Sequence, residues 1–240
     1  DFRNAVVSAR KAQKSWEAKS AINRGQILYR IAEILEGRKL QFIEELVITG
    51  SSRLQAKNEV EKSIDRLIYY AGWSDKFQQI FSSVNPVASN HFSFSTLQAT
   101  GVVSIISDNA YSLLGLISVL APVIVGGNTC VILPSEVKPM VSISFAEVIN
   151  TSDVPHGVVN ILTGKRNELV SHFASHKDVN SISYSGENNE EIMKIEQMSV
   201  ENLKRVKFYN GKNWNVNTEQ SPYFIKDFQE IKTTWHPTEV

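Results

Sequence analysis

The most constraining feature of the sequence is an apolar segment, residues 113–125, between two runs rich in Val and Ile. The segment is apolar on nearly every face, which is typical of a buried helix and not of an amphipathic surface helix. The flanking runs, 101–107 and 126–136, have the short β-branched character of buried strands. Two such strands around an apolar helix predict a βαβ unit in a parallel sheet that is covered on both faces.

The rest of the chain extends this alternation. Downstream, helical and strand patterns follow one another, which predicts a doubly wound α/β fold with a mostly parallel, Rossmann-like sheet. The expected helices cover 141–149, 167–175 and 189–198, and the expected strands cover 158–162, 180–184 and 204–209. Upstream, apolar residues at helical spacing predict helices at 4–16, 21–47 and 55–81, whose charged residues are expected on a solvated surface. Residues 91–95 alternate as a strand of a hairpin does.

Length, charge and cysteine content exclude several classes of protein. A chain of 240 residues buries a sizeable core, and its formal net charge of zero gives no electrostatic basis for a nucleic-acid or anionic-membrane partner. No apolar run reaches transmembrane length. The lone Cys130 cannot form an internal disulfide, which favours a reducing, cytoplasmic location. The chain begins at Asp1 without a Met, so the sequence leaves open whether it is a fragment.

The central unit carries a family resemblance. Two short sequence motifs follow the apolar helix: Gly-Asn-Thr at 127–129 and Pro-Ser-Glu at 134–136. This segment resembles the cofactor domain of the aldehyde dehydrogenases, in which a strand, a Pro-Trp-Asn-Phe-Pro turn and an apolar helix precede Gly-Asn-Thr and Lys-Pro-Ser-Glu. Segments within 24–28 and 63–76 also resemble the family sequence and extend the resemblance over roughly residues 5–212. It implies a cofactor-domain fold at 1–212 and a linker with a C-terminal strand at 213–240.

The catalytic residues of the family are replaced at the matching positions. The Asn of the Pro-Trp-Asn-Phe-Pro turn, which donates to the oxyanion, matches Ala110, and Asn109 lies one residue early and is expected to point elsewhere. The glutamate base matches Tyr209 or Phe208, depending on where a one-residue gap falls. The nucleophilic cysteine belongs to a second domain that has no counterpart here, and Cys130 is expected to be a buried apolar residue. No catalytic residue is therefore predicted.

The positions that bind the adenosine ribose of NAD in the family are partly kept. The ribose lysine matches Leu133, whereas Ser135 and Glu136 remain. Glu136 is a candidate for a ribose hydroxyl, and equally for a surface residue or a helix cap. With Gly186, these residues form a vestigial cofactor-binding set.

The pyrophosphate site of the family is more strongly altered. Its Phe-Thr-Gly-Ser motif matches residues 184–187. Glu187 occupies the serine position of the motif, and Glu191 occupies the position of a glycine further along the family sequence. Carboxylates at a helix N-terminus stabilise the empty helix and repel a pyrophosphate. No cofactor is therefore expected, and NAD is expected only if the family site still functions.

The tail gives the partner hypothesis. Residues 223–235 resemble the C-terminal strand of aldehyde dehydrogenases, which adds to the sheet of a partner subunit; an edge strand on its own domain is the alternative. The arrangement is similar to the degenerate second copy in tandem-domain aldehyde dehydrogenases. It implies a homo-oligomer, or a complex with an active aldehyde dehydrogenase domain or subunit.

Three functions are consistent with these residues. The leading hypothesis is a catalytically inactive aldehyde dehydrogenase-like domain that acts as a structural or oligomerisation module. The alternatives are NAD-dependent aldehyde oxidation as part of a larger or partner-completed enzyme, and a vestigial nucleotide or small-ligand binding module. His172 and His176 stand four residues apart on an expected helix, but no third ligand accompanies them, so no metal site is predicted.

Overall fold

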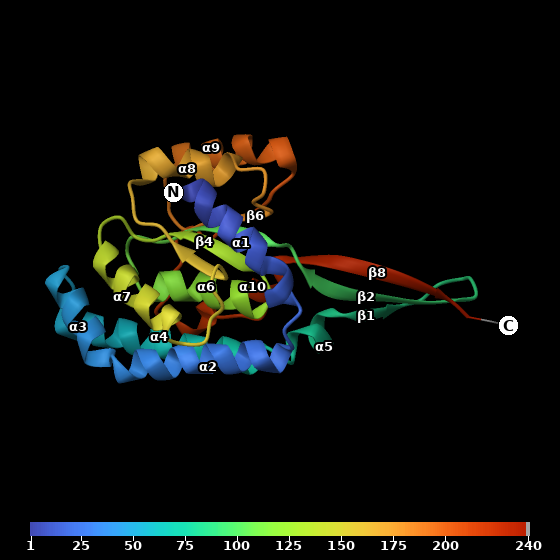
Figure 1. Ribbon diagram of the computed structural model, residues 1–240, viewed down its shortest axis with the longest axis horizontal. Coiled ribbons are helices and arrows are strands. Elements are labelled where there is room, and N and C mark those ends of the chain that lie inside the picture. The colour runs from blue at the N-terminus through green and yellow to red at the C-terminus, as the bar shows by residue number, and fades with distance from the viewer. Residues whose placement is uncertain (239–240) are drawn as a thin grey trace.

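The core of the computed structural model, which describes residues 1–238, is a sheet of five parallel strands (Figure 1). Their order is β5-β4-β3-β6-β7, so the chain moves outward from the central strand and then returns to its other side. This is the doubly wound parallel sheet that the sequence predicts. The strands are β3 (Val102–Ile106), β4 (Thr129–Leu133), β5 (Val159–Ile161), β6 (Ser181–Tyr184) and β7 (Arg205–Phe208).

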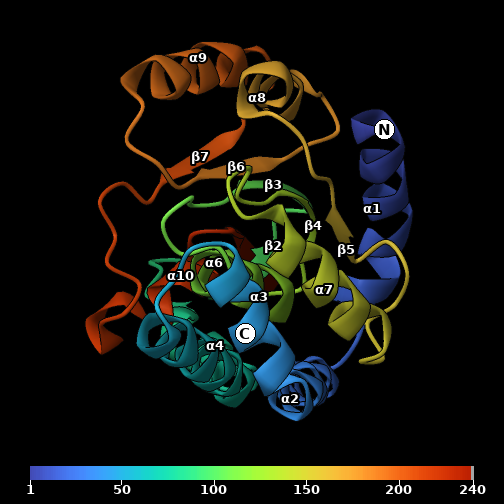
Figure 2. The ribbon, with the colours of Figure 1, turned by 90° about the vertical axis from the view of Figure 1, so that its left-hand side faces the viewer.

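Helices cover both faces of this sheet (Figure 2). One face packs against α1 (Phe2–Glu17), α8 (Arg166–Ser175) and α9 (Asn189–Ser199). The other packs against α6 (Leu114–Val125) and α7 (Pro139–Asn150), with α2 (Ala21–Gly37), α3 (Lys39–Ile48) and α4 (Arg53–Trp73) outside them. Shorter elements are α5 (Phe77–Phe81), α10 (Tyr223–Lys226) and the 3-10 turns η1 (Val200–Asn202) and η2 (Asn217–Glu219).

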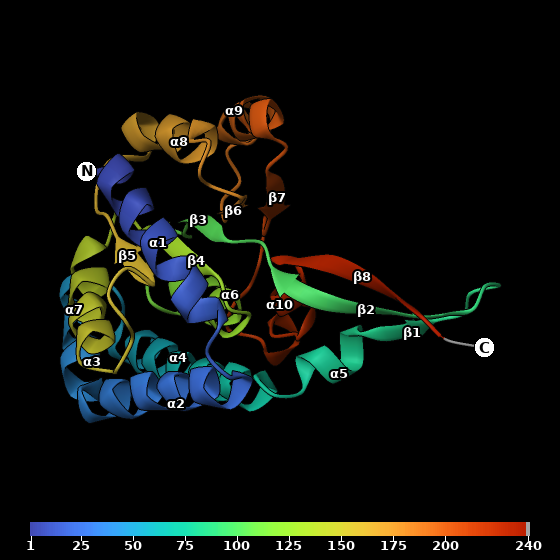
Figure 3. The same ribbon diagram turned by 45° about the vertical axis from the view of Figure 1, so that its right-hand side comes forward.

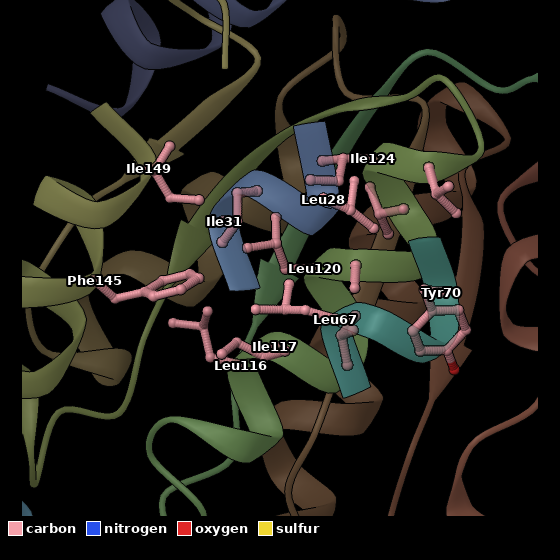
Figure 4. Close-up of a cluster of buried hydrophobic side chains, with 14 of the residues drawn as sticks. Leu28, Ile31, Leu67, Tyr70, Leu116, Ile117, Leu120, Ile124, Phe145 and Ile149 are labelled. Atoms are coloured by element: carbon pink, nitrogen blue, oxygen red, sulfur yellow. The ribbon is translucent and has the colours of Figure 1, made fainter. Parts of the chain in front are cut away.

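Helix α6 is the centre of the larger core, as its composition predicts. Each of its residues is buried, and side chains of α2, α4 and α7 pack around it (Figure 4). The indole Nε1 of Trp16 donates to the carbonyl of Ile124 (3.0 Å), which ties α1 to the end of α6. The labelled core residues are Leu28, Ile31, Leu67, Tyr70, Leu116, Ile117, Leu120, Ile124, Phe145 and Ile149.

Two of the expected long helices are each divided. The helix expected at 21–47 breaks at Arg38, where φ is −103° and ψ is 10°, directly after Gly37. The helix expected at 55–81 ends at Trp73, and α5 follows. In both cases the apolar spacing resumes after a short break, so periodicity alone does not reveal the interruption.

The charged residues of α4 are not all on a solvated surface, contrary to the expectation. Glu59 and Arg66 are buried. The Glu59 carboxylate accepts from the backbone N–H groups of Leu113 (2.8 Å) and Leu114 (3.2 Å) and thereby caps α6. Burial raises the pKa of this carboxyl. Glu59 thus links α4 to α6. The helical pattern of α4 alone does not predict this contact.

A second, antiparallel sheet projects from the α/β body (Figures 1 and 3). Its order is β1-β2-β8, from β1 (Ser83–Asn85), β2 (His91–Ala99) and β8 (Gln229–Pro237). The predicted hairpin is confirmed, and its strand extends to Ala99. The tail is a strand only from Gln229, because α10 occupies Tyr223–Lys226 and buries Ile225. β8 pairs with β2 of its own chain along its whole length.

No helix in the described residues is long and apolar enough to cross a membrane.

Lys204 is expected to make the stability of the fold depend on pH. Its Nζ donates to the carbonyl of His176 (2.8 Å) and to Asn202 Oδ1 (2.7 Å), and burial lowers its pKa to about 8. The unfolded value is about 10.4, so between these values the unfolded chain binds more protons and the free energy of unfolding rises with pH. From about pH 7.5 to 9.5 we expect a rise of about 1 kcal/mol relative to Lys204→Met. Urea denaturation at each pH checks this, and parallel pH profiles of the two proteins would contradict it.

Candidate functional site

A cleft of about 970 Å³ opens at the carboxyl edge of the parallel sheet. The strand order reverses between β3 and β6, and ligands of doubly wound folds bind at this position. The cleft is formed by the turns after β3, β4, β6 and β7 and by the start of α8. Its lining includes residues 108–111, Glu136, 165–167, 184–188, Glu191, Tyr209 and 211–213.

Arg166 lies at the base of this cleft and is only 7% exposed. Its Nη2 donates to the carbonyls of Ser107 and Ser185, which directly follow β3 and β6. The guanidinium therefore lies across the ends of β3 and β6, the two strands between which the strand order reverses. It donates hydrogen bonds to the backbone carbonyls that follow them.

Glu191 and Tyr184 complete this arrangement. Glu191 Oε2 accepts from the Tyr184 hydroxyl (2.8 Å) and lies 3.6 Å from Arg166 Nη1. Burial, and then the hydrogen bond to Glu191, raise the pKa of Tyr184 to about 12, so its phenol is a neutral donor. We call Arg166, Tyr184 and Glu191 the cleft cluster. It occupies the region where the resemblance places the pyrophosphate.

Two of the three predicted cofactor residues line the cleft. Glu136 Oε2 accepts from the backbone N–H of Arg166 (2.7 Å), so its carboxylate caps the start of α8. Gly186 is closely packed, because a Cβ there would lie 2.7 Å from the Tyr184 hydroxyl and 3.1 Å from Arg166 Nη1. Ser135 is fully buried, outside the lining residues, and its Oγ accepts from the backbone N–H of Lys138 (3.3 Å).

The N-terminus of α9 is already capped. The Asn188 side chain accepts from the backbone N–H groups of Glu190 (3.0 Å) and Glu191 (3.4 Å). These N–H groups are the donors that bind anions at other helix N-termini. An anion at this helix would have to displace the Asn188 cap.

The positions that match the catalytic residues of the family lack their functional groups. Ala110 and Asn109 both line the cleft. Tyr209 also lines it; its hydroxyl donates to Asp227 Oδ2 (2.9 Å), and burial, reinforced by Asp227, raises its pKa well above the usual value. A neutral phenol of this kind is a donor and not a general base. Cys130 is fully buried as expected, and burial raises the pKa of its thiol.

Several buried polar atoms beside the cleft lack a partner among the described residues. They include the hydroxyls of Ser107 and Ser185, the Nε of Arg166 and the Oδ1 of Asn109. Buried polar groups usually bind protein atoms or ordered water. These atoms mark the part of the cleft where a small polar molecule would find hydrogen bonds. In residues 1–238, no three His, Cys, Asp or Glu side chains form a group that could hold a metal ion.

Arg166 is the site residue that sequence reasoning missed. It begins α8 two residues after Gly164, where a charged residue is ordinary. Its partners are distant in sequence: Ser107 lies 59 residues before it, and Ser185 lies 19 residues after it. The one available signal was the unusual Glu191, since a carboxylate near buried strand ends requires a cation.

Comparisons with known proteins agree with the fold. The model of the aldehyde dehydrogenase family matches residues 1–219. The human cytosolic 10-formyltetrahydrofolate dehydrogenase is 33% identical in an alignment over 218 residues that covers 88% of this chain and 24% of that protein. Omega-crystallin of Enteroctopus dofleini is 30% identical over 85% of this chain and 42% of its own length.

Solved structures give the same result. PnpE from Pseudomonas sp. WBC-3 superposes with a TM-score of 0.83 at 27% identity and covers 88% of this chain and 43% of its own. PnpE has also been solved in complex with nicotinamide adenine dinucleotide. The chain thus spans about a quarter of the formyltetrahydrofolate dehydrogenase and less than half of PnpE. With most of its length matched by the family model, this chain belongs to the aldehyde dehydrogenase family.

Proposed function

We propose that this chain is a catalytically inactive aldehyde dehydrogenase-like domain that acts as a structural and oligomerisation module. The observation that carries the proposal is the set of side chains at the cleft. In the resemblance, Ala110 matches the oxyanion donor of the family and Tyr209 or Phe208 matches its base; Ala110 and Tyr209 both line the cleft. A methyl group and a neutral phenol that donates to Asp227 cannot perform these two roles.

We infer further that the cleft does not fit a dinucleotide. Leu133, at the position of the ribose lysine, is fully buried. The buried cation beside the cleft, Arg166, is held by two carbonyls and Glu191, so a pyrophosphate would compete with a carboxylate already in place. At the start of α9, the N–H groups of Glu190 and Glu191 already donate to the Asn188 side chain and are not free to donate to an anion. Each feature opposes a bound polyanion.

The projecting sheet supports the assembly role. It stands apart from the α/β body (Figure 3), where its outer strand is accessible. Residues Ile231, Lys232, Thr233 and Trp235 of β8 are exposed. A strand edge of this length usually pairs with another chain or is covered. The proposed partner is a second copy or an active aldehyde dehydrogenase subunit.

Calorimetric titration with NAD tests the inactive state. We expect no binding heat at millimolar cofactor and no NADH formation when aldehyde is added, because the cleft cluster occupies the pyrophosphate region. An intact aldehyde dehydrogenase is the positive control for both measurements. Micromolar NAD binding would contradict the proposal, as would NADH formation that persists in Cys130→Ser.

One observation favours a second candidate, a small-ligand binding module. The unpartnered hydroxyls of Ser107 and Ser185 and the Nε of Arg166 offer hydrogen bonds at the base of the cleft. Mixed charges around them, with Glu136 and Glu187 beside Lys165 and Lys212, favour a small neutral or zwitterionic molecule over a polyanion. A thermal-shift screen of such molecules tests this candidate, which fails if no compound raises the melting temperature.

A further inference from the structure

The turn that follows β7 carries the one Asn-Gly pair of the sequence, at Asn210 and Gly211. In such a pair, the side-chain amide of the asparagine is next to a backbone nitrogen that no side chain shields, because glycine has no Cβ. Attack of this nitrogen on the amide carbon closes a five-membered ring. The pair therefore makes the chain able to modify itself, provided that the fold leaves both groups free to meet.

The fold leaves both groups of this pair free. Asn210 is exposed and lies in a turn. The backbone N–H of Gly211 donates to no backbone carbonyl in the described part of the chain, residues 1–238. Gly211 has a φ of 63°, in the left-handed region that glycine adopts at little cost, and a Cβ there would contact only Glu187 Oε1, at 3.6 Å. No backbone hydrogen bond of Gly211 has to break before its nitrogen reaches the side chain.

Asn180 shows that exposure alone does not create such a site. It is also exposed and is followed by a small residue, Ser181. Its Oδ1, however, accepts from the backbone N–H of Val102 (3.0 Å) and from Arg10 Nη2 (2.6 Å). Ser181 begins β6 and is fully buried. These contacts fix the Asn180 amide to a neighbouring strand and hold it away from the nitrogen that follows it.

The neighbours of Asn210 form their hydrogen bonds with other parts of the chain. The Tyr209 hydroxyl donates to Asp227, and Asn213 accepts from the Tyr111 hydroxyl. Asn210 takes part in neither contact. The turn is thus fixed on both sides of an asparagine that is itself unconstrained.

We propose that Asn210 is a site of spontaneous deamidation, at which asparagine converts to isoaspartate and aspartate. The Gly211 nitrogen loses its proton to solvent base and bonds to Asn210 Cγ; the Cγ–Nδ2 bond breaks, and ammonia leaves with a proton from water. Water then opens the succinimide ring. Opening at the backbone carbonyl gives isoaspartate, in which the main chain runs through the side chain, and opening at the other carbonyl gives aspartate. In sum, one water is consumed and one ammonia is released.

Both products place a new carboxylate at the mouth of the cleft. Tyr209 and Gly211, on either side of Asn210, line the cleft, and Glu187 lies beside Gly211. The added carboxylate moves the formal net charge of the chain from zero to −1. Because it increases the negative charge beside Glu187, the modified cleft opposes an anionic ligand more strongly.

Isoaspartate also lengthens the main chain by one carbon atom. This atom is inserted between two fixed points, the Tyr209 hydroxyl on Asp227 Oδ2 (2.9 Å) and Lys212 Nζ on Glu219 Oε2 (2.6 Å). The extra length has to be taken up between them. The isoaspartyl form is therefore expected to be less stable than the aspartyl form, which carries the same charge on an unchanged backbone.

Peptide mapping of the full chain tests the site. The purified protein is incubated at physiological temperature and mildly alkaline pH, then digested at acidic pH to suppress further reaction. Trypsin cleaves after Lys207 and Lys212 and releases Asn210 in a short peptide. Mass spectrometry is expected to show conversion of Asn210 before any other asparagine, with Asn180 intact over the same period. An isoaspartate-specific methyltransferase is expected to label the same peptide.

Two variants serve as matched controls. Asn210→Gln keeps an exposed amide but would have to close a larger ring, so it is expected to stay intact. Gly211→Ala places a Cβ beside the attacking nitrogen and disfavours the left-handed turn, so it is expected to slow the conversion. If the Ala variant does not fold, the Gln variant still decides whether the acidic form arises from Asn210.

A synthetic peptide of residues 207–213 separates the effect of the fold from that of the sequence. Conversion of the peptide while Asn210 of the folded chain stays intact would overturn the proposal, because the turn would then block ring closure. Conversion of Asn180 at the rate of Asn210 would overturn it as well, since the contacts of Asn180 would then give no protection.

Ion-exchange chromatography separates the modified forms for urea denaturation. The isoaspartyl form is expected to unfold at a lower urea concentration than freshly purified Asn210→Asp, which adds the charge alone. Equal midpoints would refute the backbone part of the proposal. The site is independent of the proposed function, because its chemistry needs only the turn and water; NAD binding by the unmodified chain would refute the inactive cleft and leave the deamidation unaffected.

Discussion

Replacement of Arg66 by Met is expected to lower the free energy of unfolding by about 3 kcal/mol. Arg66 is 2% exposed, and its guanidinium joins α4 to α6 and to the loop at 214–219. Nη1 donates to Ser118 Oγ and to the carbonyl of Glu219, both at 2.8 Å, and Nη2 donates to the carbonyl of Trp214 (3.0 Å). Met retains much of the packing but leaves these acceptors without a donor, at about 1–3 kcal/mol for each buried one. Relief of the buried charge, whose pKa burial lowers, offsets part of the loss.

Urea denaturation at neutral pH measures this effect. Arg53→Met is the control, because Arg53 begins the same helix and its side chain is 69% exposed in a surface ion pair with Glu44. Its change is expected to stay within about 0.5 kcal/mol. A loss below about 1 kcal/mol in Arg66→Met would show that the loop at 214–219 is held by other contacts. Since this loop leads to β8, the same variant is also expected to weaken any assembly through the projecting sheet.

Arg66 shows which features of the fold a sequence pattern predicts and which it does not. The helix that carries it is predicted by apolar residues such as Val60 and Leu67, and the parallel sheet follows from the apolar segment at 113–125. These predictions hold because local periodicity and burial agree. Whether a charged residue on such a helix faces water or a distant carbonyl is decided by contacts far along the chain: Trp214 lies 148 residues from Arg66. The periodicity of one helix contains no information about contacts with residues so far along the chain.

The candidate site was likewise predictable from the sequence only in part. The positions of Glu136 and Gly186 in the cleft were predictable, because the turns after parallel strands meet at one edge of the sheet. Ser135 was misplaced because a residue adjacent to a strand end in sequence can point into the body, as this one does. The carboxylate of Glu191 was predicted to repel a ligand, but its contact with Arg166 depends on the fold.

The largest expected effect concerns that contact. Arg166→Met is expected to lower the free energy of unfolding by about 3–4 kcal/mol, because it leaves Glu191 as a partly buried charge without its cation. The carbonyls of Ser107 and Ser185 also lose their side-chain donor. Lys165→Met is the matched control. Lys165 is the preceding residue, also lines the cleft, and is 75% exposed in a surface pair with Glu168. Its removal should change stability by less than about 0.5 kcal/mol.

A double-mutant cycle then separates the contact from its surroundings. Glu191→Gln keeps an acceptor for the Tyr184 hydroxyl and removes the charge, so combined with Arg166→Met it should recover about 1–2 kcal/mol of the loss. Additive effects, with no recovery, would mean that Glu191 and Arg166 act independently and that the carboxylate faces solvent or a ligand. Coupling of the expected size would mean that Glu191 stabilises the fold through Arg166. The glutamate that the resemblance places at a glycine position of the family would then contribute to folding.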